Sequence, residues 1–232
     1  MISLDKIKQA HTSIATYINR TPLILSNHLS QNRIVKLKLE SLQITNSFKL
    51  RGATNKLLSL DNEQKQKGVI AVSTGNHGKG VAHAARVLGI KSTIFMSSMV
   101  PQYRKEAIEA LGAKVEIIGN NSDEADLYAK KLAKEKNITL VHPFDDEEVI
   151  AGQGTVGLEM LEDFPDVDTV IIPTSGGGLI GGIALAIKLQ KPSVQTIAVS
   201  MERGPSMYES LKQGKPTDVE ELETLADCLG GS

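Results

Sequence analysis

The 232-residue sequence has few of the residues on which several classes of protein depend. It has one cysteine, Cys228, which excludes an internal disulfide and a cysteine-rich metal site and fits a reducing compartment such as the cytoplasm. It has no tryptophan and only 3% aromatic residues, which argues against stacking platforms for single-stranded nucleic acid. Its formal net charge of -1 provides no global field that would favour nucleic acid or an anionic membrane.

The sequence also lacks a convincing membrane segment. Residues 1–10 are amphipathic and charged, without the apolar core of a signal peptide. The stretch between Asp168 and Lys188 carries no charge, but Pro173 and three consecutive glycines interrupt it. A strand, a turn and a helix are therefore the better interpretation of this stretch.

Apolar strand patterns alternate with helical patterns along most of the chain. Strands are predicted over residues 34–39, 69–73, 92–96, 115–118, 139–142, 170–173 and 196–200. Helices are predicted over residues 3–18, 76–88, 101–111, 122–136, 148–161, 179–189 and 205–213. This alternation predicts an α/β fold with parallel sheets and right-handed crossovers. Because the strands are apolar throughout, we expect both sheet faces to be covered.

Lys49 is a candidate reactive residue, although a lysine on the solvated face of a helix is the ordinary alternative. Its neighbours Phe48 and Leu50 are apolar, and partial desolvation favours the neutral, nucleophilic amine. Asn46 and Ser47 are typical of a helix N-cap. We therefore expect Lys49 in a first helical turn at the end of a strand, where α/β proteins bind ligands.

A first glycine-rich turn lies between a predicted strand and a predicted helix, with the sequence Ser73-Thr74-Gly75-Asn76-His77-Gly78-Lys79-Gly80. An ordinary turn needs fewer glycines, and backbone N–H groups at a helix start bind anions. The turn is therefore interpreted as an anion site, for example for a substrate carboxylate. His77 taken alone is more typical of a structural histidine than of a catalytic one.

A second glycine-rich turn, Thr174-Ser175-Gly176-Gly177-Gly178-Leu179, also joins a strand to a helix. Three consecutive glycines let the backbone approach a ligand closely, and a phosphate is a natural guest. The spacing Gly176-x-Gly178-x-x-Gly181, with Glu202 after the next strand, also matches a dinucleotide-binding fingerprint. A third glycine pair, Gly152 and Gly154, lies inside a helical pattern and is interpreted as close packing of that helix on a sheet.

Lys49 favours one of these alternatives. A dinucleotide enzyme needs no such lysine beside a separate anion-binding turn. A pyridoxal phosphate enzyme needs a lysine for its Schiff base, a glycine cradle for the phosphate and a second cradle for the substrate carboxylate.

The three motifs together resemble those of a known family. The segments 47–53, 75–78 and 175–179 stand in the order and spacing of the fold-type II pyridoxal phosphate enzymes, in the threonine/serine dehydratase and serine racemase branch. The resemblance extends from Arg20 to Asp227. Residues 73–75 and 200–204 look most like the hydroxyectoine-utilisation dehydratases.

The resemblance implies two doubly wound parallel-sheet domains with the cofactor cleft between them. Residues 1–45 plus 143–232 are expected to form the larger cofactor domain, and residues 46–142 the smaller substrate-binding domain. Family members continue well past Ser232, so the larger domain is expected to be incomplete here. The residue facing the ring nitrogen and a glycine on the second face of the cofactor ring are expected in that missing part.

The resemblance also assigns roles to individual residues. Lys49 would carry the cofactor and act as the catalytic base, Phe48 would pack on the cofactor ring, and Asn76 would bind its phenolic oxygen. Thr74 stands where the racemases carry a serine that serves as the second base. The substrate carboxylate would be surrounded by Ser73, Thr74, Gly75, Asn76 and His77. The phosphate would be bound by Ser175, Gly176, Gly177, Gly178 and Leu179.

The implied reaction is β-elimination from a small hydroxy amino acid such as L-threonine or L-serine, giving a 2-oxo acid and ammonia. Alternatives are a dehydratase of hydroxyectoine catabolism, an amino-acid racemase, a catalytically incomplete remnant or partner subunit and, least favoured, a dinucleotide-binding domain. Ser200 and Ser206 occupy the positions of the branch's metal-binding carboxylates, so no metal is expected. A cytoplasmic homodimer that binds neither nucleic acid nor membrane is expected.

Overall fold

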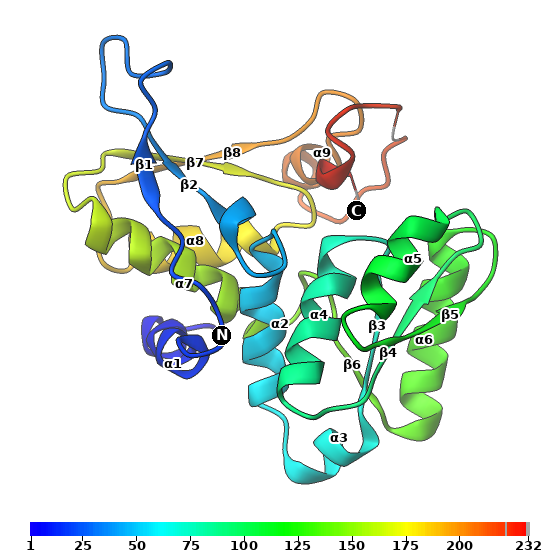
Figure 1. Cartoon of the computed structure of the whole chain (residues 1–232). Helices are drawn as coiled ribbons and strands as arrows, with labels where there is room; N and C mark the ends of the chain where they lie inside the picture. Colours follow the sequence, from blue (N-terminus) through cyan, green and yellow to red (C-terminus); the bar gives the residue numbers. More distant parts are fainter. Residues whose placement is uncertain (221, 231–232) are drawn as a thin grey trace.

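The computed structural model describes residues 1–220 and 222–230 and confirms the α/β fold (Figure 1). Its helices are α1 (Leu4–Ile14), α2 (Lys49–Leu58), α3 (Asn62–Lys67), α4 (Asn76–Val87), α5 (Gln102–Glu109), α6 (Ser122–Lys136), α7 (Glu147–Asp163), α8 (Gly178–Lys188) and α9 (Ser206–Gln213), with the 3-10 helices η1 (Glu40–Leu42) and η2 (Asp227–Leu229). Its strands are β1 (Leu23–Leu25), β2 (Lys36–Lys38), β3 (Val69–Val72), β4 (Ser92–Met96), β5 (Lys114–Ile117), β6 (Thr139–Leu140), β7 (Thr169–Pro173) and β8 (Gln195–Val199).

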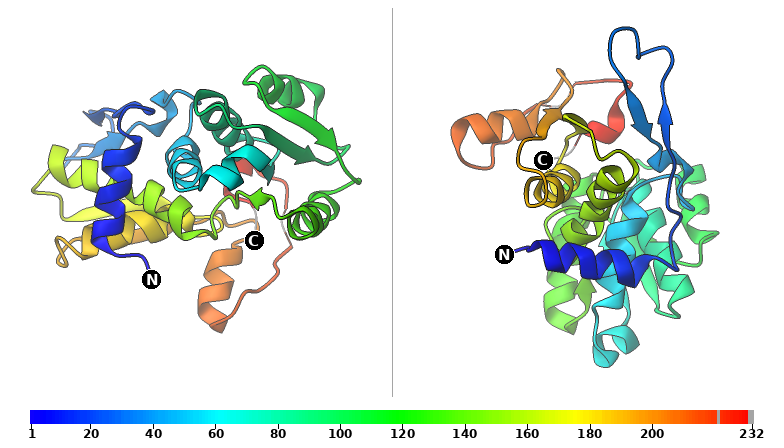
Figure 2. Two further views of the ribbon diagram at one scale, coloured as in Figure 1. Left: turned by 90° about the horizontal axis from the view of Figure 1, so that it is seen from below. Right: turned by 90° about the vertical axis from the view of Figure 1, so that its left-hand side faces the viewer.

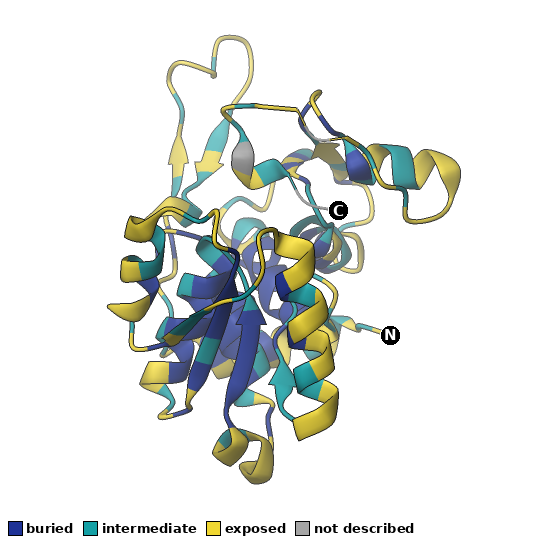
Figure 3. Cartoon of the chain, turned by 90° about the vertical axis from the view of Figure 1, so that its right-hand side faces the viewer, coloured by how far each residue is buried: buried dark blue, intermediate teal, exposed yellow. Residues whose placement is uncertain are grey.

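The larger sheet is parallel, with the strand order β5-β4-β3-β6. Successive side chains of a strand point to opposite faces, and both faces are covered. Ala71 and Ile94 pack with residues of α2, α4 and α5, whereas Ile70 and Phe95 pack with Ala125 and other residues of α6. Strands β3 and β4 are mostly buried, and Figure 3 shows buried strands in the middle of this part of the molecule. The prediction of two covered faces is confirmed for this sheet.

The second parallel sheet, formed by β7 and β8, is covered on one face only. Val170 and Ile172 pack against residues of α7 and α8. On the opposite face Ile171 pairs in register with Ile197 and is 66% exposed. The prediction of two covered faces is wrong for this sheet, because the described residues place no helix over Ile171. The antiparallel strands β1 and β2 are joined by a long turn that projects from the molecule (Figures 1 and 2).

Helices α2 and α7 meet closely at a pair of glycines. A Cβ placed on Gly152 of α7 would lie 2.6 Å from the Cα atom of Gly52 in α2. A Cβ placed on Gly182 of α8 would lie 2.7 Å from the backbone nitrogen of Gly154. Such distances leave no room for a side chain. The prediction of close packing at Gly152 and Gly154 is correct, but the partners are helices rather than the predicted sheet. The start of α2, where Lys49 lies, is thereby fixed against α7.

A buried group of charges also anchors α2. The Arg51 guanidinium donates to both carboxylate oxygens of Glu159 in α7 and to both of Glu40 in η1. Lys38 of β2 donates to the same Glu159 carboxylate. Arg51 and Glu159 are 0% and 1% exposed, so each charge depends on its partners.

Within the described residues, no helix is both long and apolar enough to cross a membrane.

Candidate active site

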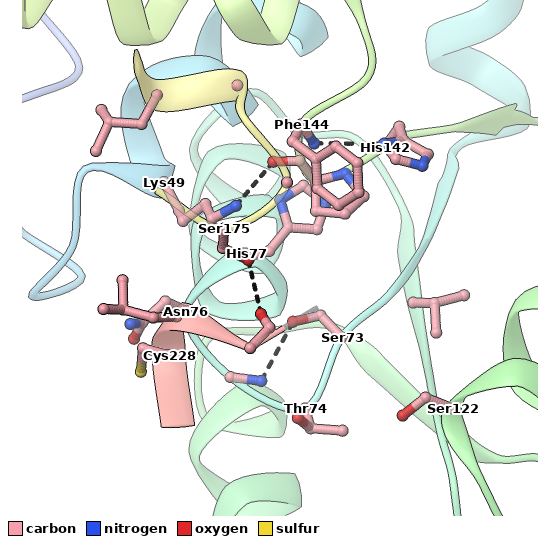
Figure 4. Close-up of a pocket in the computed structure, with 18 of the residues that line it drawn as sticks. Lys49, Ser73, Thr74, Asn76, His77, Ser122, His142, Phe144, Ser175 and Cys228 are labelled. Atoms are coloured by element: carbon pink, nitrogen blue, oxygen red, sulfur yellow. Dashed lines mark hydrogen bonds between the residues drawn. The ribbon is translucent and has the colours of Figure 1, made fainter. Parts of the chain in front are cut away.

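The three predicted motifs meet in one cavity of about 900 Å³ (Figure 4). Its walls include the segments 47–49, 73–77 and 175–179. The second segment follows β3 and the third follows β7, so both turns lie at carboxyl ends of parallel strands. This is where open α/β sheets bind their ligands. The structure therefore brings together the residues that the sequence singled out, with the qualification for His77 given below.

Lys49 is the first residue of α2, and its amine reaches into the cavity. Nζ donates a hydrogen bond of 2.8 Å to the carbonyl oxygen of Pro143. Burial lowers the pKa of Lys49 from 10.5 to about 8, although the nearby Cys228 acts in the opposite direction. A lysine with this pKa is partly neutral at mildly alkaline pH, and the neutral amine is both a nucleophile and a proton acceptor.

The predicted N-cap of α2 is wrong in detail. Phe48 occupies the N-cap position, and Asn46 adopts a left-handed backbone conformation with φ of 60°. Ser47 still contributes, because its Oγ accepts a hydrogen bond of 3.3 Å from the backbone N–H of Lys49. The turn therefore orients the first residue of the helix through Ser47, while Phe48 faces the cavity.

The first glycine-rich turn leads into α4 without a side-chain cap. Gly75 is the N-cap residue, and in the described part of the chain no side chain accepts from the first backbone N–H groups of the helix. Ser73 Oγ accepts a hydrogen bond from the Gly75 N–H and so shapes the turn. Thr74 and Asn76 also line the cavity. An uncapped helix start beside hydroxyl and amide side chains is suited to an anion such as a carboxylate.

His77 has the environment of a structural histidine, although it also lines the cavity. Its ring is buried, and Nε2 lies 2.8 Å from the carbonyl oxygen of Val141. A carbonyl can only accept, so Nε2 carries the proton and Nδ1 is left as a buried acceptor without a hydrogen-bond partner in the described part of the chain. Burial, with a further contribution from Lys49, lowers the pKa of His77 to about 3. This neutral ring cannot hold a carboxylate by charge, and the expected place of His77 beside the substrate carboxylate stays a prediction.

The second glycine-rich turn forms another uncapped helix start. Gly177 is the N-cap of α8 and has φ of 85°, a conformation that favours glycine. Among residues 1–220 and 222–230, no side chain caps the first N–H groups of α8. Ser175 Oγ donates a hydrogen bond of 2.7 Å to the carbonyl oxygen of Gly230. The uncapped amides and the helix dipole suit a phosphate at this position.

Several residues of the cavity were missed by the sequence interpretation. Val141, Pro143 and Phe144 line it from the segment after β6, and Cys228, Leu229 and Gly230 line it from the end of the described chain. The predicted strand over 139–142 did contain a signal, because residues that follow a parallel strand lie at the ligand-binding edge. The sequence interpretation assigned no site role to residues 228–230, which the structure places along the cavity.

Comparison with known proteins identifies the family. The sequence profile of the family described as "Pyridoxal-phosphate dependent enzyme" matches residues 14–232. The chain belongs to this family. It is 49% identical over 230 residues to the L-threonine dehydratase catabolic TdcB of Staphylococcus aureus (strain USA300), a match that covers 98% of this chain and 66% of that protein. The chain thus spans just under two thirds of the length of this relative.

Solved structures agree with this membership. Maize serine racemase superposes with a TM-score of 0.94 at 35% identity, over 99% of this chain and 71% of that chain. The threonine deaminase of T.th. superposes with a TM-score of 0.90 at 40% identity, over 98% of this chain and 74% of that chain. These matches confirm the resemblance to the dehydratase and racemase branch of the fold-type II enzymes.

The cavity fits the cofactor of this family. It offers a partly neutral amine for an aldehyde and, at a separate wall, an uncapped helix start for a phosphate. The dinucleotide alternative fits less well. In a dinucleotide-binding fingerprint the third glycine allows a helix to pack closely on a strand. Gly181 stands at that position, yet a Cβ placed on it would have no neighbour within 4 Å. Glu202, the expected ribose-binding acid, does not line the cavity.

Proposed function

We propose that the protein is a pyridoxal phosphate-dependent ammonia-lyase. It removes water from a small hydroxy amino acid such as L-threonine or L-serine by β-elimination, and the enamine product then reacts with water to give a 2-oxo acid and ammonia. The observation that carries this proposal is the position of the Lys49 amine. It reaches into a cavity whose walls include the uncapped starts of α4 and α8. The 49% identity to a threonine dehydratase supports it.

The two helix starts divide the anionic groups between them. Residues 175–179 bind the cofactor phosphate through backbone amides at the start of α8. Ser73, Thr74, Gly75 and Asn76 bind the substrate carboxylate at the start of α4, and Asn76 also reaches the phenolic oxygen of the cofactor. Phe48 packs against the cofactor ring. His77 contributes to this site as a neutral, buried ring rather than as a charged ligand.

Lys49 has two roles in succession. Its amine would hold the cofactor through the aldehyde group. The same amine, with a pKa lowered to about 8, would accept the proton from the substrate α-carbon. When bound, the cofactor supplies an electron sink for the charge left on that carbon. The hydrogen bond to the Pro143 carbonyl oxygen holds the free amine at the cavity wall.

The decisive experiment combines labelling with an assay. The purified chain is incubated with pyridoxal phosphate and reduced with borohydride, and the modified peptide is identified by mass spectrometry. The label is expected on Lys49, to be absent from Lys49→Ala and to be unchanged in Lys8→Ala, which alters an exposed lysine of α1. With L-threonine or L-serine the wild type is expected to release a 2-oxo acid. A label spread over surface lysines and equal in Lys49→Ala would refute the assignment.

Racemisation is a second candidate, favoured by the similarity to maize serine racemase and by Thr74 in the cavity wall. The Thr74 hydroxyl would exchange a proton on the face of the substrate opposite Lys49. Racemisation predicts solvent deuterium at the α-carbon of recovered serine together with D-serine, and Thr74→Val is expected to remove only the D-serine. A labelled chain that forms neither D-serine nor a 2-oxo acid would instead indicate a cofactor-binding remnant or partner subunit.

We further propose that the protein acts in the cytoplasm as a homodimer. Family resemblance and the single cysteine support this proposal. The uncovered face of β7 and β8 provides apolar surface that association would bury. Light scattering on the purified chain would test the assembly, and a monomer at all concentrations would contradict it.

The domain division at residues 45/46 and 142/143 likewise stays a proposal, which limited proteolysis at those boundaries would test.

A further inference from the structure

The glycine run of the phosphate cradle faces a protein side chain as well as the cavity. A Cβ placed on Gly178 would lie 2.9 Å from both Cα and Cβ of Phe144. A Cβ placed on Gly176 would overlap the Phe144 ring. Glycine is therefore required at both positions to admit Phe144, even before any ligand is considered. Phe144 follows β6 and the cradle follows β7, so the contact joins the ends of two strands from different sheets.

Phe144 is also held in place by His142, two residues earlier in the chain. Its ring stands edge-on to the His142 ring, with 4.6 Å between centroids and an interplanar angle of 89°. His142 Nδ1 accepts hydrogen bonds from the backbone N–H groups of Phe144, at 3.3 Å, and Asp145, at 2.8 Å. Figure 4 shows the two rings beside the cavity. The Phe144 ring thus has little freedom to move away from the glycines.

The adjacent residue contacts the reactive amine. The carbonyl oxygen of Pro143 accepts the hydrogen bond from Lys49 Nζ. Two consecutive residues therefore contact the two parts of the site that must bind the two ends of one cofactor. The separation between the amine and the cradle accordingly depends on the position of this dipeptide.

We propose that Phe144 is a positioning residue that gives the pocket its preference for phosphorylated pyridoxal over pyridoxal itself. This inference rests on the proposed function. The ring and backbone of Phe144 pack directly against Gly176 and Gly178 at the cavity wall, and this contact would hold the amides at the start of α8 in a fixed direction for a phosphate. Without the ring the glycine run can relax, since glycine has the widest choice of backbone conformations. The phosphate contacts then weaken, whereas the attachment to Lys49 remains.

The test compares two aldehydes on the same variants. Wild type, Phe144→Ala, Phe144→Leu and Phe164→Ala are titrated with pyridoxal phosphate and with pyridoxal, reduced with borohydride, and scored for label on Lys49. Phe164→Ala is the matched control, because it removes an equal ring from a partly buried site near Lys36, away from the cavity. Circular dichroism establishes that each variant is folded.

Phe144→Ala is expected to weaken labelling by pyridoxal phosphate by about tenfold, the effect of a modest loss of phosphate contact, and to change labelling by pyridoxal by less than about twofold. Phe164→Ala should leave the ratio of the two affinities at the wild-type value. Equal weakening of both aldehydes, or no change in the ratio, would overturn the inference. If Phe144→Ala does not fold, Phe144→Leu decides by the same criterion. A wild type that labels with neither aldehyde would refute the proposed function itself, which is a separate outcome.

Discussion

Arg51 and Glu159 form a fully buried ion pair with two hydrogen bonds, of 2.6 and 2.9 Å, two residues along the chain from Lys49. Burial alone would raise the pKa of Glu159, but hydrogen bonds and charge from Arg51 and Lys38 outweigh it and lower that pKa. The pair therefore links the helix that begins at Lys49 to the long helix α7. Its loss should affect both stability and the placement of the amine.

Glu159→Gln is expected to reduce the free energy of unfolding by about 3–5 kcal/mol near neutral pH, because it leaves buried positive charge without compensation. Since the pKa of Glu159 is lowered in the folded state from 4.5, its contribution is present above that pH and is lost as the pH falls below it. Urea denaturation at neutral and acidic pH measures both effects, and the difference between wild type and variant should shrink in acid.

The control for this pair is Glu63→Gln. Glu63 pairs with Lys67 one turn later on α3 and is 73% exposed. Exposed pairs of this kind contribute about 0.5 kcal/mol or less. If Glu159→Gln and Glu63→Gln had equal effects, the buried pair would not have the structural role described.

Lys49→Met is expected to stabilise the chain in the absence of cofactor. The folded pKa is about 8 and the ordinary value is 10.5, so the unfolded chain binds more protons between these values and stability rises with pH across that window. The variant lacks this titration, so its advantage should be largest below pH 8 and should shrink toward pH 10.5. Thermal unfolding at a series of pH values measures it. Lys8→Met, in which an exposed lysine is replaced, should show no such trend.

Two adjacent glycines of α8 should respond in opposite ways to alanine. Gly181 is helical with open space around it, so Gly181→Ala is expected to stabilise by about 0.5–1 kcal/mol. Gly182→Ala would force a Cβ against the backbone of α7, 2.7 Å from the nitrogen of Gly154, and should destabilise by about 1–3 kcal/mol. Chemical denaturation of the two variants compares them directly. If Gly181→Ala were instead less stable than wild type, position 181 would need a glycine for close packing, as the dinucleotide-binding fingerprint requires.

The uncovered face of β7 and β8 should bind apolar dyes. Ile171 is 66% exposed and lies opposite Ile197 in the sheet. Ile171→Thr is expected to lower the fluorescence of a bound hydrophobic dye and to reduce self-association, with little change in unfolding temperature. Ile172→Thr, on the covered face, should instead lower the unfolding temperature. Unchanged dye binding in Ile171→Thr would show that the apolar face lies elsewhere.

The sequence was most informative where local chemistry determines the structure. The turns at residues 73–77 and 175–179 were placed correctly beside the cavity, because a glycine-rich turn between a strand and a helix has few alternatives. Helix α6 was predicted with its observed bounds, from Ser122 to Lys136. Helix α3 was missed since it is polar throughout and depends on a capping box at Asp61 rather than on an apolar stripe.

Features that depend on distant contacts could not be predicted in this way. The His77 ring is fixed by a hydrogen bond to the carbonyl oxygen of Val141, which lies 64 residues away in the sequence. Phe144 contacts glycines about thirty residues later, and only the fold brings them together. The exposure of Ile171 could not be predicted either. A continuous apolar strand predicts burial, but it does not indicate which element covers each face of the sheet.

Strand β6 ends at Leu140, and its chain then turns into the cavity, so the main-chain oxygens of Val141 and Pro143 are available to His77 and Lys49. The reactive amine is thus held by an atom that every amino acid possesses. Substitutions at position 143 that preserve the backbone path should leave this anchor intact. An insertion or deletion between Leu140 and Phe144 would displace it by about 3.3 Å per residue. Evolution of this site is therefore expected to tolerate changes of residue here and to reject changes of length.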